Sequence, residues 1–137
     1  MPSRRNILKG SLLASVAALL PTQALGQVSS QSRVKACKTS AIPLKGGKIV
    51  TVGSQSFLIT QPSKGVYRAF SASCTHRGCG IGPMDPKQNA VRGGVVACNC
   101  HGAQFNPKDG AVVRGPATAA LTKYTVKVYA GYLFVYA

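Results

Sequence analysis

The sequence predicts an all-β domain that carries two metal-binding loops. Short runs of β-branched and aromatic residues recur from Lys48 to the C-terminus, and glycine or proline bounds most of them. No helical periodicity of convincing length appears after Gln27. This pattern is typical of stacked antiparallel sheets in a sandwich or barrel. The 137 residues leave room for one such domain after an N-terminal leader.

Residues 1–26 are interpreted as an export signal rather than as part of the fold. The chain opens Ser3-Arg4-Arg5-Asn6-Ile7-Leu8-Lys9, an apolar run follows over 10–20, and the small residues Ala24 and Gly26 come next. A charged start, an apolar middle and a small-residue end describe a signal peptide. The consecutive arginines resemble the twin-arginine type. The apolar run is shorter than the roughly 20 residues of a spanning helix, so cleavage near Gly26 is favoured over permanent anchoring.

The leader predicts the location of the mature protein, which is the periplasm or the outer face of a bacterial cytoplasmic membrane. The twin-arginine resemblance implies export of a folded protein with its cofactor already inserted. Residues 27–45 are small and polar and are predicted to form a flexible linker. The folded domain is predicted over 46–137.

Cys37 lies within the predicted linker and outside the two motifs described below. A free or intermolecular thiol is the expectation for an odd cysteine in an exported chain. Attachment of a lipid is less favoured, because Val34-Lys35-Ala36 lacks the apolar and small residues that usually precede a lipid-bearing cysteine.

Six strands are predicted in the domain. Each is a short run rich in valine, isoleucine, tyrosine or phenylalanine. They cover 48–52, 56–60, 66–71, 94–97, 124–129 and 132–136. The last two alternate apolar and polar residues around a turn at Ala130-Gly131, as expected of a hairpin. The third and fourth run into the two motifs.

The two motifs are Cys74-Thr75-His76-Arg77-Gly78-Cys79 and Cys98-Asn99-Cys100-His101-Gly102, and they contain the only two histidines of the chain. Both follow predicted strands, and loops supported by a rigid sheet commonly carry function. Cys74 and His76 are two residues apart, so in an extended loop both side chains project the same way. Gly102 after His101 permits a tight turn.

Two thiolates and two imidazoles from two loops can hold a metal centre that neither loop could hold alone. Iron–sulfur clusters and zinc both accept these donors. Zinc sites usually take both cysteines from one segment and both histidines from another, whereas each loop here supplies one of each. A metal-free set of disulfide cysteines is the remaining alternative. An iron–sulfur centre is favoured, and with it electron transfer over a zinc-stabilised binding module.

Cys79 and Cys100 are the two motif cysteines left over. Cys100 adjoins His101. Because adjacent residues do not readily bind the same metal, the Cys100 side chain is expected to point elsewhere. Leftover cysteines on loops that meet at one metal lie close together, and an exported protein encounters an oxidising compartment. A Cys79–Cys100 disulfide is therefore expected, closing a loop of about 20 residues and adding roughly 3 kcal/mol.

The two motifs resemble the two cluster-binding boxes of Rieske [2Fe–2S] proteins, and the resemblance extends over about 48–137. It implies one [2Fe–2S] cluster per chain and a domain of stacked antiparallel sheets. Cys74 and Cys98 would bind the inner iron, and His76 and His101 the outer, more exposed iron.

Further residues follow from the same resemblance. It implies the Cys79–Cys100 disulfide, which is present in the cytochrome bc branch of the family. Gly115-Pro116-Ala117 resembles the proline loop that covers the cluster from a third side.

Two positions depart from the family pattern. Quinol-oxidising members usually carry a serine two residues after the second ligand histidine and a tyrosine two residues further on, whose hydroxyls donate hydrogen bonds to sulfur at the cluster. Here these positions hold Ala103 and Phe105, whose side chains cannot donate. We expect a lower reduction potential than in hydroxyl-bearing relatives, and quinol oxidation is in doubt.

The composition limits the partners and the chemistry. The chain has seventeen basic residues and only two acidic ones, Asp85 and Asp109, which gives a formal charge of +15. The basic residues are scattered and no recognition helix is predicted, so no nucleic-acid partner is expected. An acidic redox partner, the subunits of a membrane oxidoreductase or an anionic membrane surface fits the charge better. Both aspartates suit turns.

No paired carboxylates, Ser-His-Asp set or nucleotide-binding loop is present, so any catalytic activity would belong to a complex. The sequence therefore predicts an exported one-electron carrier, or the Rieske subunit of a membrane-associated oxidoreductase. A ferredoxin component of an oxygenase is the alternative. That class is usually cytoplasmic, so the leader and the paired cysteines argue against it.

Overall fold

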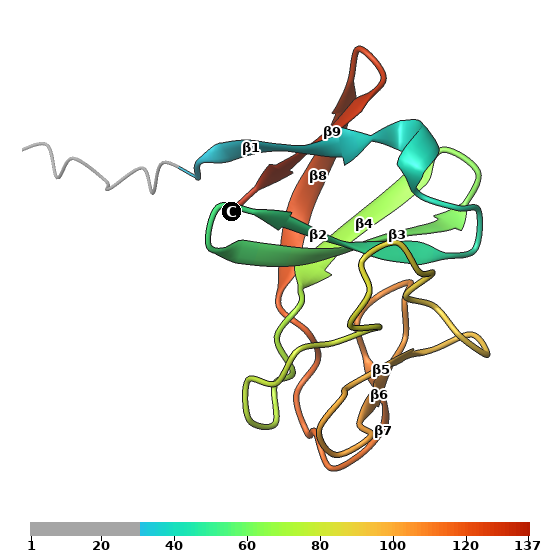
Figure 1. The fold of residues 1–137 in the computed structure, drawn as a ribbon, viewed down its shortest axis with the longest axis vertical. Coiled ribbons are helices and arrows are strands. Elements are labelled where there is room, and N and C mark those ends of the chain that lie inside the picture. The colour runs from blue at the N-terminus through green and yellow to red at the C-terminus, as the bar shows by residue number, and fades with distance from the viewer. Residues whose placement is uncertain (1–30) are drawn as a thin grey trace, which may run out of the picture.

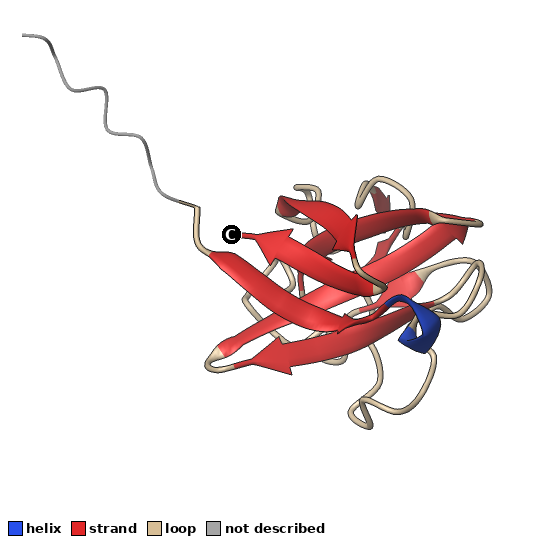
Figure 2. Cartoon of the chain, turned by 90° about the horizontal axis from the view of Figure 1, so that it is seen from above, coloured by secondary structure: helices blue, strands red, loops and turns tan. Residues whose placement is uncertain are grey.

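Nine strands and one 3-10 helix make up residues 31–137, the part of the chain that the computed structural model describes (Figure 1). The secondary structure is almost entirely β, as predicted (Figure 2). The elements are β1 (Arg33–Lys38), η1 (Thr39–Ala41), β2 (Gly47–Val52), β3 (Gln55–Ser63), β4 (Val66–Ser71), β5 (Val96–Ala97), β6 (Gln104–Phe105), β7 (Val112–Arg114), β8 (Lys123–Tyr129) and β9 (Tyr132–Tyr136).

Six of these strands form one antiparallel sheet in the order β1-β9-β8-β4-β3-β2. Its outermost strands, β1 and β2, contact each other, so the sheet curls towards a barrel. In Figure 1, β1 lies above β2 in the view. The curl encloses apolar side chains on the concave side.

The second sheet is small and carries the site. It has the order β5-β6-β7 and belongs to the long segment that connects β4 to β8. Figure 1 shows this segment extending from one end of the large sheet, away from the β8–β9 hairpin. The two motifs lie within this segment, after β4 and after β5, so both occupy loops as predicted.

Two hydrophobic clusters share the strands β3 and β4. Phe57 and Ile59 of β3 point into the barrel, where they pack with Leu133 and Val135. Leu58, between them, points to the opposite face and joins the cluster beneath the metal-binding loops. Because successive residues of a strand project to opposite faces, a strand buried on both sides reads as a continuous apolar run. β3 therefore anchors the site segment directly to the barrel core.

The prediction of a flexible linker over 27–45 is wrong from Arg33 onward. Residues 33–38 form β1, which pairs antiparallel with β9 from Arg33↔Tyr136 to Lys38↔Tyr132. The strand is irregular between Lys35 and Cys37 and places Cys37 against the barrel core. The alternation of exposed basic and half-buried small residues is that of an edge strand, and pairing with β9 orders it.

The six predicted strands are all present, within a few residues at their ends. The predicted leader and the first residues of the linker, 1–30, lie outside the described residues. Between residues 31 and 137, no helix is long and apolar enough to span a bilayer.

Candidate metal centre

The same kind of backbone hydrogen bond closes each of the two motif loops. The N–H of Cys74 donates to the carbonyl oxygen of Cys79 at 2.7 Å, and the N–H of Cys98 donates to the carbonyl oxygen of Ala103 at 2.7 Å. In each loop the bond joins the first cysteine to the residue five positions later. A second bond in the first loop runs from the N–H of Gly78 to the carbonyl of Cys74 at 2.8 Å. Gly78 has φ +73°, a conformation that glycine adopts without strain.

Several links hold the loops against each other. Ile81 forms an antiparallel bridge with Cys98, and the N–H of Asn99 donates to the carbonyl of Gly80 at 3.2 Å. Cys79 and Cys100 form a disulfide with a Cα–Cα distance of 6.2 Å. The predicted bridge between the leftover cysteines is therefore confirmed, and it fixes the two loops as one unit.

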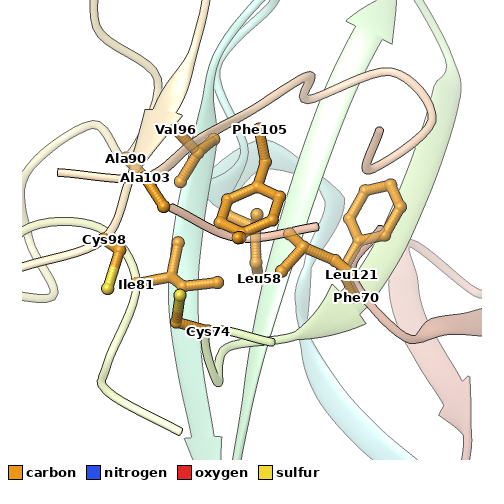
Figure 3. Packing of buried hydrophobic residues seen from close by; sticks show 11 residues of the cluster. Leu58, Phe70, Cys74, Ile81, Ala90, Val96, Cys98, Ala103, Phe105 and Leu121 are labelled. Atoms are coloured by element: carbon orange, nitrogen blue, oxygen red, sulfur yellow. The ribbon is translucent and has the colours of Figure 1, made fainter. Parts of the chain in front are cut away.

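The four predicted ligands form two close pairs, one of cysteines and one of histidines, and the cysteines are more buried than the histidines. Cys74 and Cys98 are 3% and 4% exposed and belong to the apolar cluster under the loops. Figure 3 shows both sulfur atoms at one end of this cluster, beside Ile81. His76 is half-buried and His101 is exposed. The imidazole rings lie edge to face with centroids 5.2 Å apart.

The two thiols lie close enough to shift each other's pKa, in opposite directions. Burial raises the pKa of Cys74, and the neighbouring Cys98 raises it further. Burial also acts to raise the pKa of Cys98, but hydrogen bonds from the backbone N–H groups of Cys100 and His101 and from Cys74 outweigh it and lower the pKa.

Backbone N–H groups are aimed at both sulfur atoms. Those of His76 and Arg77 act to lower the pKa of Cys74, and those of Cys100 and His101 act to lower the pKa of Cys98. Such donors stabilise negative charge on sulfur. The sequence motifs gave no direct sign of this contribution, because any residue can supply a backbone N–H.

The donors suit a centre with two metal ions. The thiols form one close pair and the imidazoles another. In a [2Fe–2S] centre of mixed ligation, two cysteines serve one iron and two histidines the other. The chemistry and pairing of the donors fit this cofactor.

A third segment covers the first loop. The Thr75 hydroxyl donates to the carbonyl of Ala119 at 2.6 Å, which fastens residues 115–120 beside the loop. Ala117 is buried in the cluster under the site, whereas Gly115 and Pro116 are exposed. The role of Thr75 is not evident from sequence, because its partner is a backbone carbonyl 44 residues away.

Ala103 and Phe105 are fully buried in the apolar cluster that also contains Cys74 and Cys98. Both have 0% exposure. Their side chains contribute packing and no hydrogen-bond donor.

A family model described as the Rieske [2Fe-2S] domain matches residues 32–127. The chain belongs to this family. Its cofactor is a Rieske-type [2Fe–2S] cluster, and its Rieske domain functions in one-electron transfer. Family membership favours the iron–sulfur interpretation of the donor set over the zinc-stabilised module.

Known proteins with Rieske domains are similar over much of the chain. The cytochrome b6-f complex iron-sulfur subunit of Chlorobaculum tepidum is 32% identical over 96 residues, which is 70% of this chain and 49% of that protein. A putative respiratory nitrate reductase Rieske subunit of Haloferax mediterranei is 39% identical over 69 residues, or 49% of this chain and 28% of that protein. The chain thus spans half or less of the length of these curated relatives.

A solved structure shares the fold. The plasma membrane Rieske protein of Synechocystis PCC 6803 superimposes with a TM-score of 0.60 and 26% identity, covering 76% of this chain and 99% of the other. The family model matches from residue 32 and so includes β1. The sequence had predicted that the domain begins later, at residue 46.

Proposed function

We propose that Cys74, His76, Cys98 and His101 hold the [2Fe–2S] cluster, with the two thiolates on the inner iron and the two imidazoles on the outer iron. The observation that carries this assignment is the paired arrangement of the donors, with both cysteines buried and both histidines towards the surface. When bound, the cluster takes up and releases one electron.

The residues around the ligands have separate tasks in this proposal. Backbone N–H groups of His76, Arg77, Cys100 and His101 stabilise charge on the thiolates. The apolar side chains of Ile81, Leu58 and their neighbours exclude water from the sulfur side. The exposed imidazole of His101 is the group that a redox partner meets first.

We further propose that the protein is the Rieske subunit of a membrane-associated oxidoreductase. The named relatives are subunits of a cytochrome b6-f complex and of a respiratory nitrate reductase, which supports this role. The twin-arginine-like leader supports a location at the outer face of the membrane. Ala103 and Phe105 provide no side-chain donors, which supports a low potential within the Rieske range.

The ligand set is tested by single substitutions. In Cys74→Ser, His76→Ala, Cys98→Ser and His101→Ala, we expect loss of the Rieske absorption and of the EPR signal of the reduced protein. Cys37→Ser is the matched control, because Cys37 is the remaining cysteine outside both motifs and lies in β1. Retention of a native spectrum by any ligand variant, or its loss in Cys37→Ser, would refute the assignment.

The subunit role is tested separately, by purifying the native protein from membranes. We expect the protein to co-purify with other redox subunits. A protein recovered alone and only from the soluble fraction would contradict the proposed complex and leave the ligand set untouched.

A further inference from the structure

The outer face of β1, β9 and β8 is basic and aromatic. The central strand β9 places Leu133 and Val135 in the barrel core, so the intervening aromatic residues point outward. Register pairs them with residues of the flanking strands that share this face. We define the basic–aromatic face by Arg33, Lys35, Lys38, Lys127, Tyr129, Tyr132, Phe134 and Tyr136.

Cations and rings on this face are in direct contact. The Arg33 guanidinium lies 4.7 Å from the ring centroid of Phe134, and the Lys127 ammonium lies 5.2 Å from that of Tyr136. The Lys35 ammonium is closer still, 3.7 Å from the ring of Tyr132. All three contacts join diagonal neighbours on adjacent strands, a reach that long side chains have across a sheet. The three cations therefore lie side by side over a row of aromatic rings.

No acidic side chain on this face offsets these cations. The three strands contain no acidic residue. The chain has only two, and both lie in the segment between β4 and β8. There Asp85 accepts a hydrogen bond from the N–H of Lys87 and Asp109 from that of Ala111, each within a turn. The face thus presents unbalanced positive charge to any anionic surface.

From this arrangement we propose that the basic–aromatic face rests on the anionic phospholipid headgroups of a bilayer. Tyrosine and phenylalanine rings beside lysine and arginine match the membrane–water interface, where rings sit at headgroup level and cations reach phosphates. The proposal rests on the proposed function only for placing the protein at a membrane, and it is independent of the ligand set.

The termini and the site agree with this orientation. Ser32 and Ala137 are joined by two backbone hydrogen bonds of 2.9 and 3.2 Å, so the N-terminal segment enters next to the Arg33–Tyr136 pair. Figure 1 shows the cluster-bearing segment on the side away from β1 and the β8–β9 hairpin. A domain lying on this face leaves His101 free to meet a partner.

Vesicle binding by the full-length holoprotein tests the proposal. The face variant is Arg33→Gln/Lys35→Gln/Lys127→Gln, and the matched control is Lys64→Gln/Lys87→Gln/Lys108→Gln. Each lowers the formal charge by three, and the control residues lie outside the three strands. Any binding through the leader is common to both variants. The vesicles are phosphatidylcholine alone, or phosphatidylcholine with an equal amount of phosphatidylglycerol.

We expect the wild type to prefer the phosphatidylglycerol vesicles. The face variant should lose about a hundredfold of that affinity, because it lacks three cations and each cation at an anionic leaflet contributes roughly fivefold. The control should lose much less. Equal losses in the two variants would mean that net charge alone drives binding, and absence of a preference would mean that no lipid site exists. Binding of soluble polyglutamate through the face, without vesicle binding, would identify an acidic protein as the partner. Each of these outcomes overturns the proposal.

A fluorescence measurement provides a second test. The chain contains no tryptophan, so Tyr132→Trp reports on the face alone. Met84→Trp is the control, since Met84 is 93% exposed and lies in the cluster-bearing segment. We expect a blue shift and quenching by brominated phosphatidylglycerol only for Tyr132→Trp. A response confined to Met84→Trp, equal in both or absent in both would contradict the proposal. Visible absorption, recorded for every variant, separates cluster loss from loss of lipid binding.

Discussion

The imidazoles of His76 and His101 meet edge to face, with an interplanar angle of 88°, although they belong to different loops. Neither loop contains the full set of donors, so the geometry depends on what joins the loops. The Cys79–Cys100 disulfide and the Ile81–Cys98 bridge provide that connection. The properties of the centre should therefore respond to changes in residues that bind no metal.

Removal of the disulfide should destabilise the centre. In Cys79→Ser/Cys100→Ser we expect the free energy of unfolding to fall by roughly 3 kcal/mol, because a cross-link between residues 21 positions apart no longer restricts the unfolded chain. The visible absorption should disappear at a lower denaturant concentration. Cys37→Ser controls for loss of a cysteine and should shift the transition much less. Coincident transitions for wild type and double variant would refute the clamping role.

Hydroxyl groups introduced beside the ligands should raise the reduction potential. Ala103→Ser and Phe105→Tyr place donors at fully buried positions in the apolar cluster that also contains Cys74 and Cys98, the proposed ligands. A hydrogen bond worth about 1 kcal/mol more in the reduced state raises a one-electron potential by about 40 mV. Protein-film voltammetry measures this shift. Ala90→Ser is the control, because Ala90 is buried in the same apolar cluster. A potential that stays constant or falls in both test variants would refute the prediction.

Gly110 should tolerate no side chain. Its φ is +76°, and an added Cβ would lie 2.8 Å from the Phe70 ring and 3.3 Å from the Leu121 Cβ. We expect Gly110→Ala to lower the free energy of unfolding by roughly 2–4 kcal/mol, through backbone strain and overpacking together. Gly53→Ala measures the backbone strain alone, since Gly53 has φ +61° and open space around it. This variant should lower the free energy of unfolding by about 1 kcal/mol. Equal losses in a denaturant titration would show that the Phe70 contact is unimportant.

Cys37 should react slowly with thiol reagents. Burial raises the pKa of its thiol above the ordinary 9.0, and the thiolate is the reactive form. The folded state therefore holds this proton more tightly than the unfolded state. The resulting stability is fully present below pH 9.0 and is lost as the pH rises through the higher folded-state pKa.

Alkylation of the Cys37 peptide, followed by mass spectrometry against pH, measures this difference. The midpoint for the folded protein should lie above that of the urea-unfolded chain. In Cys37→Ala the alkaline loss of stability should be smaller than in the wild type. A folded-state midpoint at or below the unfolded one would contradict the burial argument.

Much of the site was predictable from sequence because its chemistry is local. Cys74 and His76 stand two residues apart, and the two histidines of the chain both fall in the motifs. The leftover pair Cys79 and Cys100 then had few alternatives as partners. The Thr75 link to Ala119 and the backbone donors to sulfur were not predictable, because they depend on how distant segments fold together.

The strands also differ in how far the sequence alone predicts them. β3 and β9 carry enough branched and aromatic residues to be recognised alone, whereas β6 and β7 have two and three residues, too few for a periodic pattern. β1 has the sequence RVKACK and is ordered by its pairing with β9, a tertiary effect that local propensity does not contain. The basic–aromatic face depends on this pairing and is therefore visible only in the structure.

The ligand assignment of His76 and His101 can be measured directly, because the chain has no other histidine. Pulsed EPR of the reduced protein, labelled with ¹⁵N only in histidine, detects nitrogen bound to the paramagnetic cluster. We expect two strongly coupled ¹⁵N nuclei in the wild type. A spectrum with one such coupling, or with none, would contradict the proposed cluster ligation.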